Sequence, residues 1–318
     1  MTFGFQRILW GTLKKLVIAD HLNEFVRQIF SYPGEDGGMI AFAAICYTVQ
    51  LYMEFSGTMD MVIGTGEIFG ITLPENFQQP FFSKTISEFW LRWHITLGAW
   101  FRDYVFYPVS MSRRLKRRLT GVREKFGPRA ASVLSGAAAL FCVWILNGLW
   151  HGDGWQYLFF GLYHFTLILL GTIAEPCVEA FAQTHHLNRQ HWAYRTMQVL
   201  RTGVLVVIGE LFFRAETLTQ GLQMLEIMVT RFTVRYLDLP NLALYSLEKR
   251  KLLVLGLGLL AVLANSILRE KKIDVRQKLA DRKLSVRWGV YAGMILYILL
   301  FGAYGLGYIP VDPIYAQF

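Results

Sequence analysis

The feature of this sequence that most constrains its fold is a set of long apolar segments without charged residues. Residues 131–150, ASVLSGAAALFCVWILNGLW, are an example. A helix needs roughly 20 apolar residues to cross a bilayer, and the backbone groups of such a segment must pair within it, which favours a helix. Segments that meet or approach this pattern, the last with a polar residue inside it, are 131–150, 154–174, 288–309, 252–268, 37–53 and 202–213. The sequence therefore predicts an all-α, polytopic integral membrane protein.

Composition and charge agree with a membrane location. The 318 residues are 54% hydrophobic and 17% charged, whereas soluble domains have about 25% charged residues. The net charge of +9 is concentrated in 112–129 and 269–287, which the preference of basic loops for the cytoplasm places inside. Alternation through the spans then puts 175–195 inside and the C-terminus outside. Such loops lie near anionic headgroups, so the charge indicates membrane lipid as a partner and no nucleic acid.

Several other classes of site lack their sequence patterns. Cys46, Cys142 and Cys177 have no CxxC spacing, which argues against a disulfide framework or a zinc site. No GxSxG, HExxH, phosphate-loop or dinucleotide motif occurs. We therefore expect no metal and no bound cofactor. The first 20 residues lack a cleavage site and have their basic pair after the apolar stretch, so they predict an amphipathic or first membrane helix.

Polar residues inside apolar segments are expensive in a membrane and indicate function. Gln50, Glu54, Asp60 and Glu67 lie in such a segment, and the four-residue spacing of the first two places them on one helix face. The small residues 56–58 predict a break or close packing. These groups fit a structural hydrogen-bond network, a substrate-binding surface, or the ion pathway of a transporter.

A second polar segment, 87–109, predicts an interfacial or partly buried helix. Ser87 is a candidate cap, and Glu88 and Arg92 have the favourable order for an i, i+4 pair. One aromatic-rich face is predicted to carry Trp93, Leu97, Trp100 and Tyr104, and the adjoining row Trp90, His94 and Phe101.

Two features of this segment bear on function. His94 fits either a hydrogen-bonded packing residue or a catalytic one. Arg102 and Asp103 are adjacent, so a helix directs them to diverging faces, and we expect each to find another partner.

The third polar place is LNGLWHGDGW, residues 146–155, at the end of an apolar run. Asn147 lies one helical turn before His151, so an amide and an imidazole share a face. A neutral histidine suits general-base chemistry, since its ordinary pKa is near 6.5 and burial disfavours the charged form. The alternative is a histidine that anchors a loop at the membrane interface.

Two long aromatic motifs carry a resemblance to a known family. ENFQQPFFSKTISEFWLRWHITLGAWFRDYVFYPV and GLWHGDGWQYLFFGLYH, with the upstream QLYMEFSGTMD and the terminal PIYAQF, occur in the order typical of the membrane-bound O-acyltransferase (MBOAT) family. The chain resembles most its bacterial branch of alginate O-acetyltransferases and teichoic-acid D-alanyltransferases. The resemblance implies one membrane domain over 1–318, with a helical core and a buried funnel or tunnel.

The same resemblance implies roles for particular residues. His151 corresponds to the family's near-invariant histidine and is expected to be the general base, and His94 corresponds to the second functional histidine of the bacterial branch. Further candidates for oxyanion or substrate binding are Asn147, Trp150, Arg92, Trp93, Arg102 and Asp103. The expected donor is a thioester, acetyl-CoA or an acyl carrier protein. The expected acceptor is a hydroxyl of an envelope polysaccharide or an exported carrier.

The chain departs from the family pattern in two places. Relatives usually have additional membrane helices before the point corresponding to Met1, so we expect a fragment, a separately encoded part or a short member. After DYVFYP the sequence continues VSMSRRLKRR rather than with a Leu-Gly-Gly run. Open alternatives are therefore D-alanyl transfer to teichoic acid, or a non-catalytic subunit or transporter in an envelope-modifying complex. We expect a multi-pass protein of the bacterial plasma membrane that works with an exported acyltransferase or carrier protein.

Overall fold

The computed structural model describes residues 2–304, and every regular element in that range is a helix. Six helices are long and apolar enough to cross a membrane: α3 (Gly37–Ile68), α8 (Thr120–His151), α9 (Trp155–Thr184), α10 (Trp192–Arg214), α13 (Lys249–Glu270) and α15 (Leu284–Phe301). Each matches one of the predicted segments, although 154–174 begins one residue before α9 and 288–309 extends past the end of α15. Its last residues, and the terminal PIYAQF, lie outside the described range. The prediction of an all-α, multi-pass membrane protein is confirmed.

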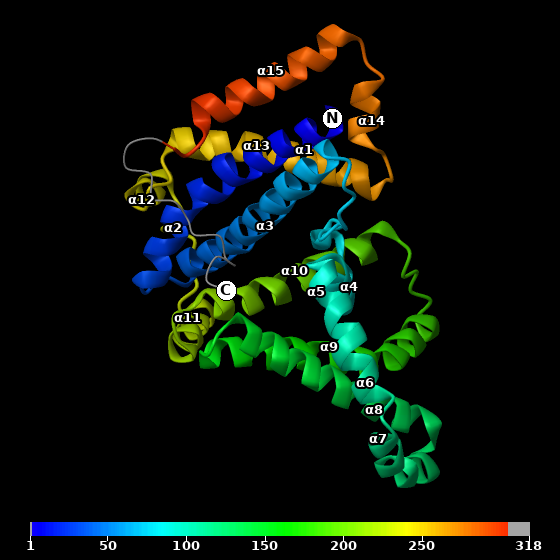
Figure 1. The fold of residues 1–318 in the computed structure, drawn as a ribbon. Coiled ribbons are helices and arrows are strands. Elements are labelled where there is room, and N and C mark those ends of the chain that lie inside the picture. The colour runs from blue at the N-terminus through cyan, green and yellow to red at the C-terminus, as the bar shows by residue number, and fades with distance from the viewer. Residues whose placement is uncertain (1, 305–318) are drawn as a thin grey trace. The chain divides into compact units, whose positions relative to one another are not determined.

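Contacts divide the chain into two compact units, residues 1–79 with 223–318, and residues 80–222. The predicted single domain over 1–318 and its tunnel stay predictions. The elements of the first unit besides α3, α13 and α15 are α1 (Thr2–Thr12), the π-helix η1 (Leu13–Ala19), α2 (Asp20–Ser31), α12 (Leu239–Leu244) and α14 (Val275–Ala280) (Figure 1). Helix α11 (Leu218–Thr230) crosses the boundary between the units.

The first unit is built on close packing between its N-terminal helices and α3, whose start is capped by Asp36. A Cβ on Gly57 would lie 2.8 Å from the carbonyl oxygen of Gly11, and a Cβ on Gly11 would lie 2.4 Å from that of Gly57. Small residues let membrane helices approach this closely. The close-packing alternative predicted for 56–58 is thus confirmed, and α3 continues through these residues without a break.

The second unit contains a hairpin of α8 and α9. A Cβ on Gly148 would lie 2.6 Å from the Tyr157 carbonyl oxygen, and one on Gly161 would lie 2.3 Å from that of Trp144. Gly152, with a φ of 152°, makes the turn that follows α8. These glycines bring the end of α8 against the start of α9, which places the face carrying Asn147 next to the aromatic residues of α9.

The remaining elements of the second unit precede this hairpin or follow it. They are η2 (Pro80–Phe82), α4 (Ile86–Arg92), α5 (Ile95–Phe101), the π-helix η3 (Arg102–Phe106), α6 (Tyr107–Ser110), α7 (Arg113–Arg118) and α10. The single helix predicted over 87–109 is wrong, because it is interrupted between α4 and α5. The predicted cap is also wrong: Thr85, not Ser87, accepts the hydrogen bond of the Glu88 amide.

Candidate active site

The interruption after α4 is centred on His94. Its backbone is left-handed, with φ 44° and ψ 55°, while Trp93 before it is extended. Left-handed residues other than glycine are uncommon, and histidine is among the residue types enriched there. Sparsely populated backbone conformations cluster at functional sites. The two aromatic rows predicted along one continuous helix are therefore divided after Trp93, although Trp100 and Tyr104 still pack with 5.4 Å between their ring centroids.

The second histidine, His151, is the last residue of α8. The Trp150 ring lies 4.8 Å from the His151 ring and 6.2 Å from the His94 ring, measured between centroids. The structure thus brings together three of the residues proposed from the sequence, from two separate motifs.

Aromatic rings pack around His151. Phe213 packs edge-on against His151 at 4.8 Å, and Phe160 lies 6.2 Å from it. Asn147, one turn earlier on α8, is only 8% exposed, and its side-chain oxygen has no hydrogen-bond partner among the described residues. A buried amide oxygen without a donor is costly. Asn147 is therefore a group that a bound substrate or water would satisfy.

His94 lies outside the six candidate spans, and its burial lowers its pKa to about 4. Burial acts in this direction because it disfavours the charged imidazolium. His94 is therefore neutral near pH 7, with one nitrogen that donates and one that accepts a hydrogen bond.

The other proposed site residues have different surroundings. Trp93 is buried and stacks on Phe89 with 5.4 Å between the ring centroids. Arg92 forms the predicted pair with Glu88, at 2.7 Å between nitrogen and oxygen.

Arg102 and Asp103 correct an expectation. They pair with each other, at 2.8 Å between Nε and Oδ1, and both side chains are about half exposed. The arginine side chain is long enough to bend back toward its neighbour, so adjacency in η3 did not separate the two charges. The hydrogen bond from Arg102 lowers the pKa of Asp103. Within the described residues neither forms an ion pair with any other group.

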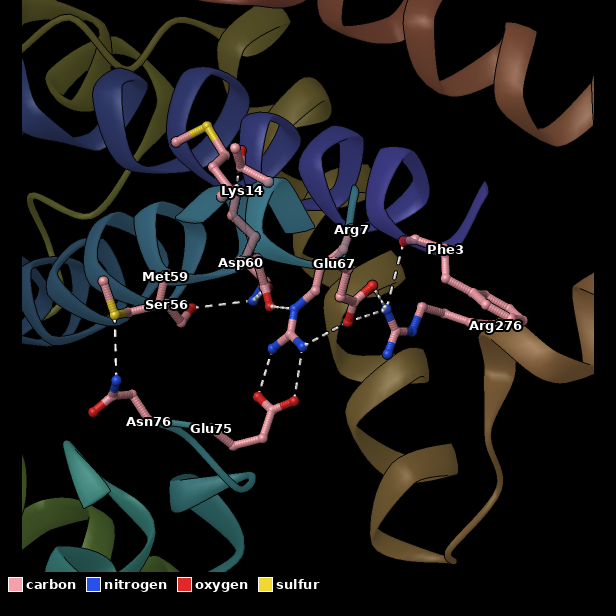
Figure 2. Close-up of polar contacts among 12 residues, drawn as sticks. Phe3, Arg7, Lys14, Ser56, Met59, Asp60, Glu67, Glu75, Asn76 and Arg276 are labelled. Atoms are coloured by element: carbon pink, nitrogen blue, oxygen red, sulfur yellow. Dashed lines mark hydrogen bonds and ion pairs between the residues drawn. The ribbon is translucent and has the colours of Figure 1, made fainter. Parts of the chain in front are cut away.

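A second polar cluster lies in the first unit, around the buried carboxylate of Asp60 (Figure 2). Arg7 donates to Asp60 at 2.9 Å and to Glu75 at 2.8 Å, and Lys14 pairs with the other oxygen of Asp60 at 2.6 Å. Glu67 pairs with Arg276 at 2.9 Å. Three cations thus meet three carboxylates: Arg7, Lys14 and Arg276 with Asp60, Glu67 and Glu75.

The neighbouring polar groups of α3 each have a partner, although the Gln50 side-chain oxygen has none among the described residues. Lys15 lies 2.7 Å from Glu54 and 2.8 Å from Asp20, and Gln50 donates to Asn23 at 2.9 Å. This arrangement supports the interpretation of these groups as a structural network rather than as an ion pathway. The cations that pair with these carboxylates were not predicted from the sequence, although the basic residues inside the apolar first helix were a signal for two of them, Arg7 and Lys14.

An aromatic group around His164 was also missed. His164 is fully buried, and its Nδ1 accepts a hydrogen bond from Trp90 Nε1 at 3.2 Å. Trp144 stacks on the imidazole at 5.3 Å and Phe160 meets it at 4.6 Å. Since Phe160 also contacts His151, this group adjoins the candidate site. The signal was the spacing of four between Phe160 and His164, which places them on one face of α9.

Among residues 2–304 no group of three histidine, cysteine or acidic side chains is arranged to hold a metal ion.

Comparison with known proteins places this chain in a family. Residues 1–121 match the model of the membrane-bound O-acyltransferase family. A Pseudomonas aeruginosa protein named "Probable alginate O-acetylase" is 33% identical over 245 residues, 77% of this chain and 42% of the relative. The chain belongs to the MBOAT family. It is also 32% identical to a Helicobacter pylori peptidoglycan O-acetyltransferase, over 69% of this chain and 37% of the relative.

A further relative of this MBOAT chain carries a different name. A Bacillus subtilis teichoic acid D-alanyltransferase is 33% identical over 52% of this chain and 40% of its own length. The chain spans about two fifths of the length of the three relatives described.

Proposed function

We propose that this protein is a membrane-embedded O-acyltransferase, which transfers an acyl group, most simply acetyl, from a thioester to a hydroxyl of a cell-envelope polysaccharide or an exported carrier. The observation that carries the proposal is that His151 and a neutral His94 both lie against the ring of Trp150, with Phe213 packed on His151. Membership of the MBOAT family and the names of the relatives support it.

In the proposed reaction His151 acts as the general base. A hydroxyl is a weak nucleophile at neutral pH and needs a base within hydrogen-bond reach. His151 takes the hydroxyl proton as the acceptor oxygen forms its bond to the thioester carbonyl carbon. When the tetrahedral intermediate collapses, the carbon–sulfur bond breaks, and the imidazolium returns the proton to the leaving thiolate. Atoms and charge then balance, with an ester and a free thiol as products.

The intermediate carries an oxyanion, which preorganised donors stabilise best where water is excluded. The neutral His94 imidazole has one N–H to donate. The amide of Asn147 and the backbone N–H groups of the turn after α8 are further donors, in that order of preference.

The proposed membrane is the bacterial plasma membrane, with 112–129 and 269–287 on its cytoplasmic face. Basic loops there attract an anionic donor such as acetyl-CoA or an acidic acyl carrier protein. An exported acyltransferase or carrier protein is the proposed partner on the other side, since an envelope acceptor lies there.

The likeness to a teichoic acid D-alanyltransferase favours one second candidate, transfer of a D-alanyl group. The chemistry at the carbonyl is the same, so His151 and His94 keep their roles. The two candidates differ in the ester that is formed. Mild alkaline release followed by chromatography separates acetate from D-alanine.

The test replaces His151 by Gln in the full protein, expressed with its natural neighbours, and measures envelope ester content. The matched control is His185→Gln, at an exposed position after α9. We expect ester to fall by roughly 10²-fold or more in His151→Gln, with an unchanged amount of folded protein, and to stay normal in the control. Unchanged ester in His151→Gln, at normal protein level, would instead indicate a non-catalytic subunit.

A further inference from the structure

A cavity of about 530 Å³ lies in the first unit, and its lining comes from α1, α3, α13, α14, α15 and the turn between α13 and α14. One part of the lining is apolar, with Ala264 and Leu268 from α13 and Met294 from α15. The other part is polar and includes Gln6, Arg269 and Lys272. Helices α13 and α15 are both candidate spans, so the cavity combines membrane-spanning walls with a charged end.

The charges at this end are not all neutralised by the protein. Arg7 and Arg276 line the cavity, but both are held in the balanced network around Asp60 and Glu67. Asp274 also lines the cavity, and its carboxylate accepts the backbone N–H groups of residues 276 and 277 at 3.0 and 3.1 Å, where it caps α14.

Two cationic residues of the lining lie outside this network. Arg269 and Lys272 are exposed, and neither side chain forms an ion pair or hydrogen bond with any residue in 2–304. One guanidinium at the end of α13 and one ammonium in the turn after it together supply several N–H donors to an anion. A phosphate oxygen is the acceptor that such a pair fits best.

A buried amide in the lining gives a second, independent indication of a ligand. Gln6 is 8% exposed, and its Nε2 is bonded to the Tyr291 hydroxyl, while its Oε1 has no partner among the described residues. An amide has two polar ends, and the tyrosine engages only one. The other end therefore requires a polar group from a bound molecule or water, because an unsatisfied buried polar atom is costly.

Position in the chain indicates the kind of molecule. Arg269 and Lys272 begin the basic segment 269–287, which the charge rule places at the cytoplasmic leaflet, where anionic lipids concentrate. Basic pockets between spanning helices on this side bind phosphorylated lipid headgroups. A free phosphate would gain nothing from the apolar wall, whereas a lipid would lay its first acyl carbons there.

We propose that this cavity binds an anionic phospholipid of the cytoplasmic leaflet. Arg269 and Lys272 hold the phosphate, Gln6 bonds a polar headgroup group, and the wall around Ala264 and Met294 receives the acyl chain. The site is independent of the acyl-transfer proposal, since none of its residues belongs to the histidine pair.

The test compares lipid binding by the purified full protein in detergent, using native mass spectrometry and thermal melting with added phosphatidylglycerol or phosphatidylcholine. The variant Arg269→Gln/Lys272→Gln removes both cations. The control Arg282→Gln/Lys283→Gln removes the same charge from the same basic segment, at residues that do not line the cavity. We expect phosphatidylglycerol to bind Arg269→Gln/Lys272→Gln roughly 30-fold more weakly than it binds the wild type. It is expected to bind the control variant about as well as the wild type.

A second variant tests the apolar end of the cavity, and other ligands test which anion the cations hold. Ala264→Trp fills the apolar end, so it is expected to weaken phosphatidylglycerol binding while the cations remain. Equal binding of phosphatidylcholine, or equal loss in both double variants, overturns the proposal. So does a full melting shift produced by inorganic phosphate or by acyl-CoA alone, since either result assigns the cations to a soluble anion.

Discussion

The network around Asp60 and the site around His151 both place polar side chains among apolar helices, but they satisfy them by opposite means. In the first, each cation lies against carboxylates within 3 Å or slightly more, so the charges cancel inside the protein. In the second, imidazoles lie against tryptophan and phenylalanine rings, and Asn147 keeps an unpaired oxygen. Full pairing stabilises a fold and leaves nothing for a ligand, whereas incomplete pairing leaves capacity for one.

The largest change in stability is expected from a substitution in the network around Asp60. Asp60→Asn leaves Arg7 and Lys14 without their shared carboxylate, and removal of one partner from a buried ion pair costs about 3–5 kcal/mol. We therefore expect a large fall in melting temperature, measured by fluorescence-detected size exclusion. The control is Glu35→Gln, which removes an exposed pair with Arg231 that is worth about 1 kcal/mol or less. A melting temperature for Asp60→Asn as high as that of the control would contradict the structural role.

The next substitution distinguishes the chemical role of the His94 imidazole from the structural role of its left-handed backbone. His94→Gly suits the left-handed turn but removes the proposed oxyanion donor, so we expect the rate of acyl transfer to fall roughly 10²- to 10³-fold with little change in stability. His94→Asn tolerates the same turn and retains an N–H donor, and it is expected to keep more activity than His94→Gly. Single-turnover rates on folded protein give the answer. Equal rates for the two variants would remove His94 from the chemistry.

Sequence patterns predicted the membrane spans directly but the site around His151 only in part. The spans followed directly from uncharged windows of about 20 residues, because crossing a bilayer imposes that length. The i, i+4 pair of Glu88 and Arg92 was also local enough to predict. The sequence motifs brought His94 and His151 into one hypothesis only through resemblance to a family, since their spacing of 57 residues carries no helical periodicity.

What the sequence did not predict depends on contacts between distant segments or on unusual backbone. The cations that neutralise Asp60 and Glu67 come from α1, η1 and α14, and no local pattern joins them to α3. The left-handed turn at His94 interrupts a stretch whose periodicity is that of a continuous helix. The pairing of Arg102 with Asp103 likewise depends on side-chain conformation, which spacing on a helix does not specify.

A smaller change in stability is expected from pH, through the protonation of His94. The folded pKa of His94 is about 4, below its ordinary value of 6.5, so its contribution to stability is fully present above pH 6.5 and is lost as pH falls toward 4. Between pH 7 and pH 5 this amounts to roughly 2 kcal/mol. Melting at both values, in the wild type and in His94→Gly, measures it. If the variant loses as much stability as the wild type, another group is responsible.

The smallest expected effect tests the aromatic group that adjoins the histidine pair. Trp90→Phe keeps a ring against Trp144 and Phe160 but removes the N–H that His164 Nδ1 accepts. We expect a loss of on the order of 1 kcal/mol, as for one buried hydrogen bond. Trp155→Phe, at an exposed tryptophan, is the matched control.

A double-mutant cycle with His164→Leu isolates this bond, since the coupling energy between the two positions is the quantity that packing alone does not supply. Coupling near 1 kcal/mol supports a bond that orients Trp90, and zero coupling contradicts it. With coupling of about 1 kcal/mol, the neutral hydrogen bond between Trp90 and His164 contributes less to stability than the carboxylate of Asp60, whose removal is expected to cost about 3–5 kcal/mol. The polar groups near His151 are then held more weakly than those of the Asp60 network.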